Sequence, residues 1–159
     1  MVMLPASILS AYTEKISDSP ELISNMYHSV KASQREGFAS LVGKTYEFSF
    51  HDFFKWMTDI FAFAGWGIVE WKVLDENKHI GVITVAHAPV ADELKGKVKT
   101  PIDHLIRGFV AGAASASFNV DIDVIELECA ALGAPVCKFE FRPVGQFQPS
   151  PEAQRQLGK

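Results

Sequence analysis

The sequence has few cysteines and no long apolar segment, and both absences exclude classes of protein. Two cysteines among 159 residues, Cys129 and Cys137, are too few for the disulfide framework of a small secreted domain, but they suffice to contribute to one metal site. The apolar runs are interrupted well before the ~20 residues that a membrane-spanning helix needs. The first residues lack the basic and apolar regions of a signal peptide. We therefore expect a cytoplasmic protein without a membrane span.

The sequence also lacks an excess of positive charge and a dinucleotide-binding motif. Fifteen Lys and Arg residues stand against 19 Asp and Glu residues, which gives a formal net charge of −4. Nucleic-acid-binding domains need a basic surface for the phosphate backbone, so we expect no nucleic-acid partner. The pair Gly65-x-Gly67 leads into a strand pattern instead of the helix that a glycine-rich phosphate-binding turn requires.

Two helices are predicted in the first 65 residues. Ser19, followed by proline, is typical of a helix start, and apolar residues then recur at helical spacing until about Gly37. A short apolar piece follows over residues 38–42. Ser49, with an acidic residue three positions later, begins a second helix with a wide apolar stripe that ends at Gly65.

A β-rich pattern begins at residue 68 and is followed by a third helix. Residues 68–74 and 80–86 are predicted to form an antiparallel hairpin. The Thr-Pro pair before Ile102 predicts a helix over 101–116, with Asp103 at its third position. Small residues at four-residue spacing on this helix allow another backbone to approach closely. They are Gly108, Gly112 and Ala116.

The last elements are two strands and a polar tail. Apolar and polar residues alternate over 118–124 and then continue in the opposite phase, so either a bulge lies near Val124–Ile125 or Glu126 and Glu128 turn inward. A final strand follows over Cys137–Phe141.

The segment 143–159 is rich in Gln, Pro and Ser, which predicts a mobile tail after a single domain over 1–142. The fold class is α+β, with helices packed on one antiparallel sheet of two hairpins.

Glu126-x-x-Cys129, followed after seven residues by Cys137, places a carboxylate and two thiols around one turn. Zn²⁺ prefers four tetrahedral ligands with S, N or O atoms, so a further ligand is required. Residues three apart on a regular strand point to opposite faces, so Cys129 must lie beyond the strand end to share a metal with Glu126. Alternatively, the two cysteines are small buried hydrophobic residues that face each other across a hairpin.

Three segments together carry a pattern that resembles a known family. They are His87–Ala91, Pro101–Gly112 and Glu126–Phe139. The most specific part is Glu-x-x-Cys…Gly…Cys-x-Phe after a Gly-x-x-x-Gly helix. The pattern, over about 51–142, resembles the 4-vinyl reductase domain family, which includes archaeal hydrocarbon-binding proteins and the sensor domains of phenol-responsive regulators.

The resemblance implies a fold shared with small subunits of vesicle-tethering complexes and with nitric-oxide-sensing haem domains, enclosing an apolar ligand chamber. In the phenol sensors one Glu and three Cys hold a zinc ion, and these positions correspond to Asp103, Glu126, Cys129 and Cys137 here. Asp103 replaces a Cys, and an oxygen ligand weakens a site suited to soft donors. His104 is an alternative ligand. The expected cofactor is a structural zinc ion, because four protein ligands leave no open position for a substrate.

Aromatic residues are concentrated in one helix and one strand. Nine of the 18 aromatic residues (12 Phe, 3 Tyr, 3 Trp) lie between Phe48 and Trp71. Such a stripe is typical of a core helix, and a ligand chamber needs the same lining, so the residues alone do not separate the two. The resemblance favours a chamber between this helix and the Gly-x-x-x-Gly helix. The candidate ligand-binding residues are Phe54, Trp66, His87 and Phe109.

The leading hypothesis is a stand-alone ligand-binding module, not an enzyme, that encloses a small hydrophobic or aromatic molecule and forms a homodimer. One alternative is reduction of a tetrapyrrole vinyl group, as the family name proposes, or carriage of a pigment precursor. A reductase without its own dinucleotide motif needs a hydride donor from a partner. The other alternative is a protein-interaction module, suggested by the tethering-complex fold.

Overall fold

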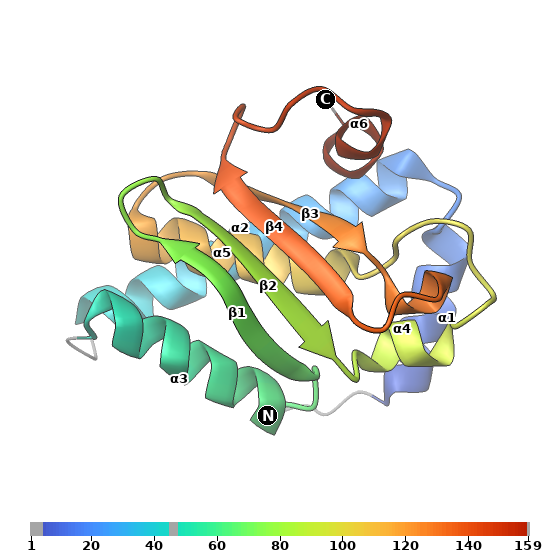
Figure 1. Cartoon of the computed structure of the whole chain (residues 1–159), viewed down its shortest axis with the longest axis horizontal. Helices are drawn as coiled ribbons and strands as arrows, with labels where there is room; N and C mark the ends of the chain where they lie inside the picture. The colour runs from blue at the N-terminus through green and yellow to red at the C-terminus, as the bar shows by residue number, and fades with distance from the viewer. Residues whose placement is uncertain (1–4, 45–47, 159) are drawn as a thin grey trace.

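The computed structural model describes residues 5–44 and 48–158, and one antiparallel four-stranded sheet lies at its centre (Figure 1). The strands are β1 (Ile68–Asp75), β2 (Ile80–Ala86), β3 (Ile122–Glu128) and β4 (Cys137–Pro143). The order β1-β2-β4-β3 places two hairpins side by side. The helices are α1 (Ala6–Ile16), α2 (Pro20–Lys44), α3 (Phe50–Phe63), α4 (Pro89–Glu93), α5 (His104–Phe118), the 3₁₀ turn η1 (Ala130–Leu132) and α6 (Pro151–Leu157). The predicted α+β class and its two hairpins are confirmed.

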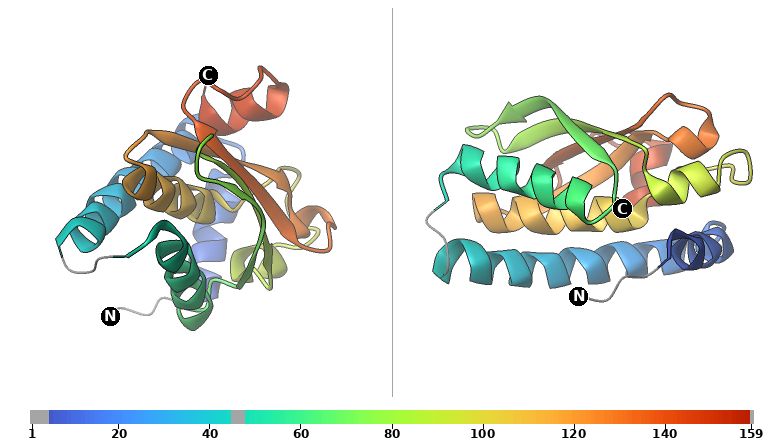
Figure 2. Two further views of the ribbon diagram at one scale, coloured as in Figure 1. Left: turned by 60° about the vertical axis from the view of Figure 1, so that its left-hand side comes forward. Right: turned by 90° about the horizontal axis from the view of Figure 1, so that it is seen from below.

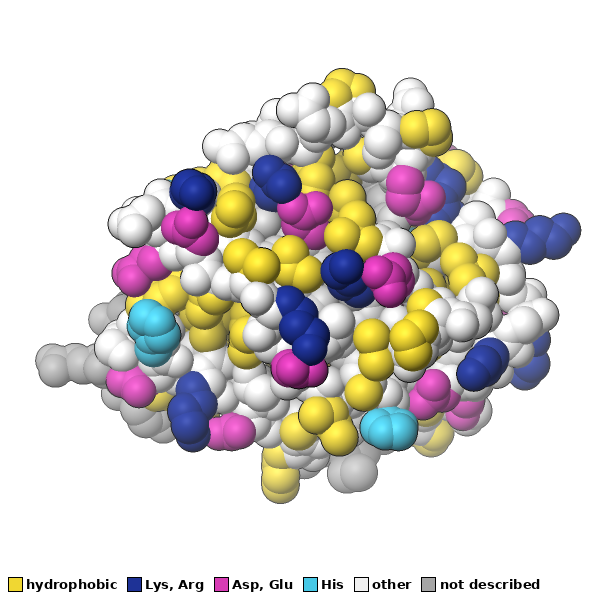
Figure 3. Space-filling model, viewed as in Figure 1, with side chains coloured by type: hydrophobic (Ala, Val, Ile, Leu, Met, Phe, Trp, Pro, Cys, Tyr) yellow, Lys and Arg dark blue, Asp and Glu magenta, His cyan; other side chains and the backbone are white. Residues whose placement is uncertain are grey.

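The helices are layered on one face of the sheet. Figure 2 shows α5 against the sheet and α2 running along the outer side of α5, while α3 lies beside them and contacts β1. Buried and half-buried residues alternate along β4, and Cys137, Phe139 and Phe141 point into the core under the helices. The opposite face of the sheet carries charged side chains of both signs between apolar ones (Figure 3).

Helices α2 and α5 approach each other closely because α5 has glycines at the contact. A Cβ atom at Gly108 would lie 2.8 Å from the Val30 Cβ atom, and one at Gly112 would lie 2.6 Å from the Lys31 carbonyl oxygen. No side chain fits at these distances without a shift of the backbone. The predicted close packing along the small residues is confirmed, and α2 is the partner.

Helix α2 continues past Gly37, where its end was predicted, as far as Lys44. A glycine inside a helix costs about 1 kcal/mol relative to alanine, which tertiary packing can offset. The packing comes from Phe38, which is 6% exposed and meets Phe53 of α3 edge to face at 5.7 Å between ring centroids. The apolar piece that follows Gly37 is therefore the last part of this helix and anchors α3.

Two boundaries around α5 also differ from the prediction. The helix begins at His104, three residues later than predicted, and Asp103 is its N-cap residue without a side-chain capping hydrogen bond. At the other end Asn119 adopts a left-handed conformation with φ of 52°, so Phe118 belongs to the helix and β3 begins at Ile122. Both differences free a side chain for tertiary contacts: Asp103 turns into the core, and Phe118 joins an aromatic cluster.

The bulge in β3 lies later than predicted. The pairing register shifts between Glu126 and Glu128, not near Val124–Ile125. Of the two glutamates, Glu126 is fully buried and Glu128 is exposed. Only one of the two therefore turns inward, and the extra residue, Leu127, absorbs the change of phase.

The segment after β4, where a mobile tail was predicted, contains helix α6. Ser150 caps it by accepting a hydrogen bond from the Ala153 N–H at 3.0 Å. Ala153 and Leu157 are 7% and 5% exposed, and Gln156 is 1% exposed. The helix packs against β3, as Figure 1 shows at the top of the sheet. Two apolar residues and one buried amide thus dock a segment whose composition is otherwise polar.

Candidate functional site

Four buried ligand-type side chains converge at the N-terminal end of α5. One ligand atom from each of Asp103, Glu126, Cys129 and Cys137 lies within 4.8 Å of the others. Asp103 precedes α5, Glu126 lies on β3, Cys129 follows the end of β3, and Cys137 begins β4. The bulge after Glu126 resolves the problem of phase, because it allows residues 126 and 129 to contribute to the same group. The structure thus brings together all four predicted metal ligands.

Two carboxylate oxygens in this cluster lack a partner. The Asp103 N–H donates to Glu126 Oε2 at 2.9 Å, while within the described part of the chain Glu126 Oε1 and Asp103 Oδ2 are buried without a hydrogen bond. On the thiol side, the Ala130 N–H donates to Cys137 Sγ at 3.3 Å. Burying a polar oxygen without a partner costs free energy, so these two atoms indicate a missing cation or proton.

The cluster is also electrostatically unfavourable as a set of anions. Burial raises the pKa of Asp103 to about 7, and the charges of Cys129 and Asp92 act in the same direction. Burial and then the neighbouring Asp103 raise the pKa of Glu126 well above its ordinary value. The Cys137 thiol, hydrogen-bonded to Cys129, has a raised pKa for that reason and through burial. Four acidic groups in one buried space need either protons or a metal ion.

The donor set fits Zn²⁺. Two thiols and two carboxyl oxygens give four ligands of the types that zinc accepts, and a tetrahedral site with Zn–S of about 2.3 Å and Zn–O of about 2.0 Å needs donors roughly 3.3–3.8 Å apart. The separations of up to 4.8 Å lie within a small closing movement of that range. Such an ion would hold the β3–β4 hairpin to the start of α5, which is a structural role.

His104, the alternative ligand, does not join the cluster. Its Nδ1 atom lies 3.0 Å from Arg107 Nη1, and the Arg107 charge, after burial, lowers the pKa of the imidazole. The Arg107 side chain is fully buried, and burial lowers its pKa to about 10. Its guanidinium lies over the Tyr27 ring, 4.4 Å from the centroid.

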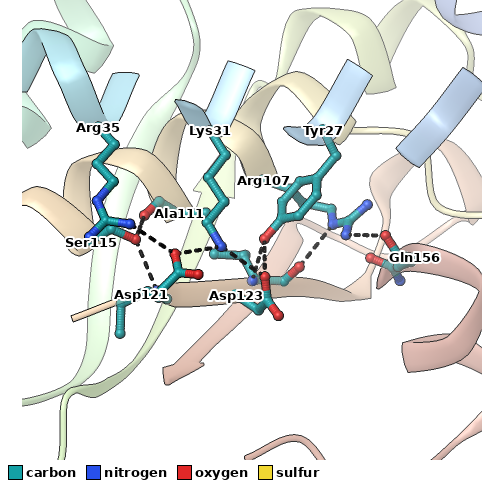
Figure 4. Close-up of polar contacts among 11 residues, drawn as sticks. Tyr27, Lys31, Arg35, Arg107, Ala111, Ser115, Asp121, Asp123 and Gln156 are labelled. Atoms are coloured by element: carbon teal, nitrogen blue, oxygen red, sulfur yellow. Dashed lines mark hydrogen bonds and ion pairs between the residues drawn. The ribbon is translucent and has the colours of Figure 1, made fainter. Parts of the chain in front are cut away.

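Sequence reasoning missed a polar network between α2, α5 and β3, although the network contains Arg107. Figure 4 shows Tyr27 and Lys31, one helical turn apart on α2, pointing past α5 toward Asp123. The Tyr27 hydroxyl donates to Asp123 Oδ1 at 3.1 Å, and Lys31 Nζ lies 3.0 Å from Oδ1 of both Asp121 and Asp123. The available signal was an arginine within the apolar stripe of α5, a position that requires buried partners.

A second feature is a layer of aromatic rings between α3, α5 and β1. Phe54, 2% exposed, lies 4.9 Å from Trp71 between ring centroids. Phe109 lies 5.4 Å from Phe38 and 5.1 Å from Phe61, mostly edge to face. One polar link crosses the layer, from Trp71 Nε1 to the Thr58 hydroxyl at 2.8 Å.

The four predicted ligand-binding residues do not form one group. Phe54 and Phe109 belong to the aromatic layer, through Phe38 and Phe53. Trp66 lies at its edge, 6.2 Å from Phe61, and lines a cavity of about 10 Å³ beside Asp103. His87 is exposed in a left-handed turn with φ of 57°.

Comparison with known proteins agrees with the fold and the motif. Residues 82–143, from β2 to the end of β4, match the 4-vinyl reductase domain family, and this segment contains all four residues of the cluster. The family predicted from the sequence is therefore confirmed for this segment. No curated protein sequence matches the chain significantly.

Three solved structures share the fold. The phenol-responsive sensory domain of the transcription activator PoxR, solved with phenol, has a TM-score of 0.71 at 19% identity, covering 93% of this chain and 79% of that one. A vinyl-4-reductase family protein of Methanocaldococcus jannaschii has a TM-score of 0.61 at 20% identity, covering 91% and 84%. A trafficking protein particle complex subunit 3 of Naegleria fowleri, covalently bound to palmitic acid, has a TM-score of 0.61 at 11% identity, covering 91% and 98%. The predicted similarity to tethering-complex subunits is confirmed at the level of fold.

Among the helices in the described residues, none is both long and apolar enough to cross a lipid bilayer, as expected from the sequence.

Proposed function

We propose that the chain is a ligand-binding domain that encloses a small apolar or aromatic molecule and is stiffened by a structural zinc ion. The observation that carries the proposal is the aromatic layer between α3, α5 and β1, which is filled by side chains in edge-to-face contact. Rings in such contacts lose little when an aromatic guest replaces one of them, because the guest offers the same surface. Helix α3 meets the sheet mainly through β1, so it can move as a wall of the chamber.

The chemistry of binding follows from the lining. An apolar guest gains roughly 25 cal/mol for each Å² of apolar surface removed from water. The Thr58 hydroxyl and the Trp71 indole N–H, now bonded to each other, supply an acceptor and a donor that can orient a polar group on the guest. Phenol has this combination of ring and hydroxyl, and the similar PoxR domain was solved with phenol.

Zinc at Asp103, Glu126, Cys129 and Cys137 supports this function indirectly. The two unpartnered oxygens and the two thiols favour a divalent ion, and the ion would fix the hairpin against which α5 packs. The homodimer and the cytoplasmic location stay predictions.

The test is a calorimetric titration of zinc-loaded protein with phenol and with toluene, together with thermal unfolding at each ligand concentration. We expect saturable binding of both and a melting temperature that rises with ligand concentration. The matched variant is Thr58→Val, which keeps the shape of the side chain and removes its hydroxyl. It should weaken phenol binding and leave toluene binding unchanged. If neither molecule binds the wild type, the ligand-binding proposal is overturned and the protein-interaction alternative gains support.

A further inference from the structure

Strand β3 lies at an edge of the sheet, yet side chains satisfy the backbone groups on its free side. An edge strand normally presents unpaired N–H and C=O groups. Here the Ile122 N–H donates to the Ser115 hydroxyl at 2.9 Å, and the Val124 N–H donates to the Tyr27 hydroxyl at 3.0 Å. Arg107 Nε donates to the Val124 carbonyl at 3.1 Å, as Figure 4 shows. The helices thus pair with the strand through side chains.

Gln156 of α6 completes this row at Glu126. Its Oε1 atom accepts a hydrogen bond from the Glu126 N–H at 2.8 Å, and its Nε2 atom donates to the Glu126 carbonyl at 2.9 Å. The amide therefore takes the place of a neighbouring strand for this one residue. Gln156 is held in turn, because Arg107 Nη2 donates to its main-chain carbonyl at 2.7 Å and Glu152 accepts a second hydrogen bond from Nε2.

The residue that Gln156 holds is a member of the metal cluster. Glu126 is fixed through its main chain by Gln156 and through Oε2 by the Asp103 N–H, while Oε1 has no partner among the described residues. Glu126 also precedes the bulge, where a strand is least constrained by its neighbour. Clamping the main chain at this point determines where Oε1 lies relative to the thiols.

We propose that Gln156 is a positioning residue for the metal centre, so that the C-terminal helix α6 belongs to the site although it lies outside the segment that matches the family. The inference rests on the proposed zinc site. Loss of the amide would leave the buried N–H and C=O of Glu126 unpaired and allow the end of β3 to shift. Residues that orient metal ligands from outside the first coordination sphere typically contribute 10–100-fold to metal affinity.

The experiment compares Gln156→Met with Leu157→Ala. Methionine keeps the volume and burial of the side chain and removes both hydrogen bonds, whereas L157A removes packing of α6 without touching Glu126. Zinc affinity is measured by competition with a chromophoric chelator, and the ligand geometry by the visible absorption of the cobalt-substituted protein. Q156M should bind zinc at least about tenfold more weakly and alter the cobalt bands. L157A should lower the melting temperature but keep zinc affinity within about twofold of the wild type.

The outcomes are distinguishable. If Q156M binds zinc like the wild type, or L157A loses as much affinity as Q156M, the positioning role is overturned while the metal site stands. If the wild type binds neither zinc nor cobalt, the metal site itself is overturned. Should Q156M fail to fold, Gln156→Glu retains the acceptor for the Glu126 N–H, and affinity and cobalt bands equal to the wild type in that variant would also overturn the proposal.

Discussion

The two ends of helix α5 lie in opposite chemical surroundings. At its N-terminal end, Asp103 and three further acidic or thiol groups lie within 4.8 Å of one another and are all buried. At its C-terminal end, Phe118 packs against Phe50 at 5.2 Å, Phe54 at 5.8 Å and Phe141 at 5.9 Å between ring centroids. One helix therefore joins a polar cluster to an apolar layer.

The difference shows which end needs something from outside the chain. Buried oxygens without hydrogen bonds cost free energy until a cation or a proton satisfies them, so the polar end is incomplete by itself. The aromatic end is satisfied by its own rings, and a guest must displace them. We therefore expect the metal end to determine stability and the aromatic end to adapt to a ligand.

The largest expected effect is that of Cys137→Ala, which removes a thiol at the start of β4. Zinc content should fall from about one ion per chain to near zero, and the free energy of unfolding should fall by roughly 5 kcal/mol or more, because metal binding contributes directly to folding. Metal analysis and calorimetry measure both. A chelator should bring the wild type to the melting temperature of the variant and leave the variant unchanged; equal melting of all samples would contradict a structural metal.

At the aromatic end, Phe54→Ala should cost about 3–5 kcal/mol, since it removes a ring that is 2% exposed. Unlike the cysteine variant, it should keep its zinc, and benzene should restore part of the lost stability by filling the cavity. The matched control is Phe63→Ala on the same helix, where the ring is 79% exposed and the expected change is within about 0.5 kcal/mol. Loss of zinc from F54A would show that the two ends are not independent.

Local signals predicted much of both ends. The Ser49 cap, which accepts from the Asp52 N–H at 3.2 Å, and the β1–β2 hairpin depend on neighbouring residues alone. The four metal-type residues followed from a motif that includes the turn between β3 and β4. These features need no knowledge of distant contacts, so the sequence was sufficient for them.

The remaining features depend on contacts between distant segments. Helix α2 crosses Gly37 because Phe38 packs on α3, and α6 forms because Gln156 bonds Glu126, 30 residues away. Neither contact leaves a periodic signal in the sequence. Among the candidate ligand residues, His87 is exposed, because which aromatic residues share a layer is decided by how α3 packs across the sheet.

The pH dependence of the two ends should differ. Zinc binds the Asp103 carboxylate, and the pKa of this group is raised to about 7 in the absence of metal. Below pH 7 zinc must displace a proton, so its affinity should fall as the pH is lowered from 8 to 6, by up to about tenfold per pH unit for each proton displaced. Toluene binding involves no titrating group in the aromatic layer and should stay constant over this range. Competition titrations at several pH values test both, and a flat zinc profile would argue against Asp103 as a ligand.

The smallest effect is expected for Asp103→Cys, which changes the metal end without removing a ligand. A third thiolate suits zinc better than a carboxylate, so affinity should rise by about tenfold, and the cobalt-substituted protein should gain sulfur-to-metal charge-transfer absorption. The Asp103 side chain makes no capping hydrogen bond, so metal-free stability should change by less than about 1 kcal/mol, the typical value of a cap. Ser49→Ala, which removes a cap that is formed, provides the comparison. Weaker zinc binding by D103C would mean that the space around residue 103 is shaped for an oxygen ligand.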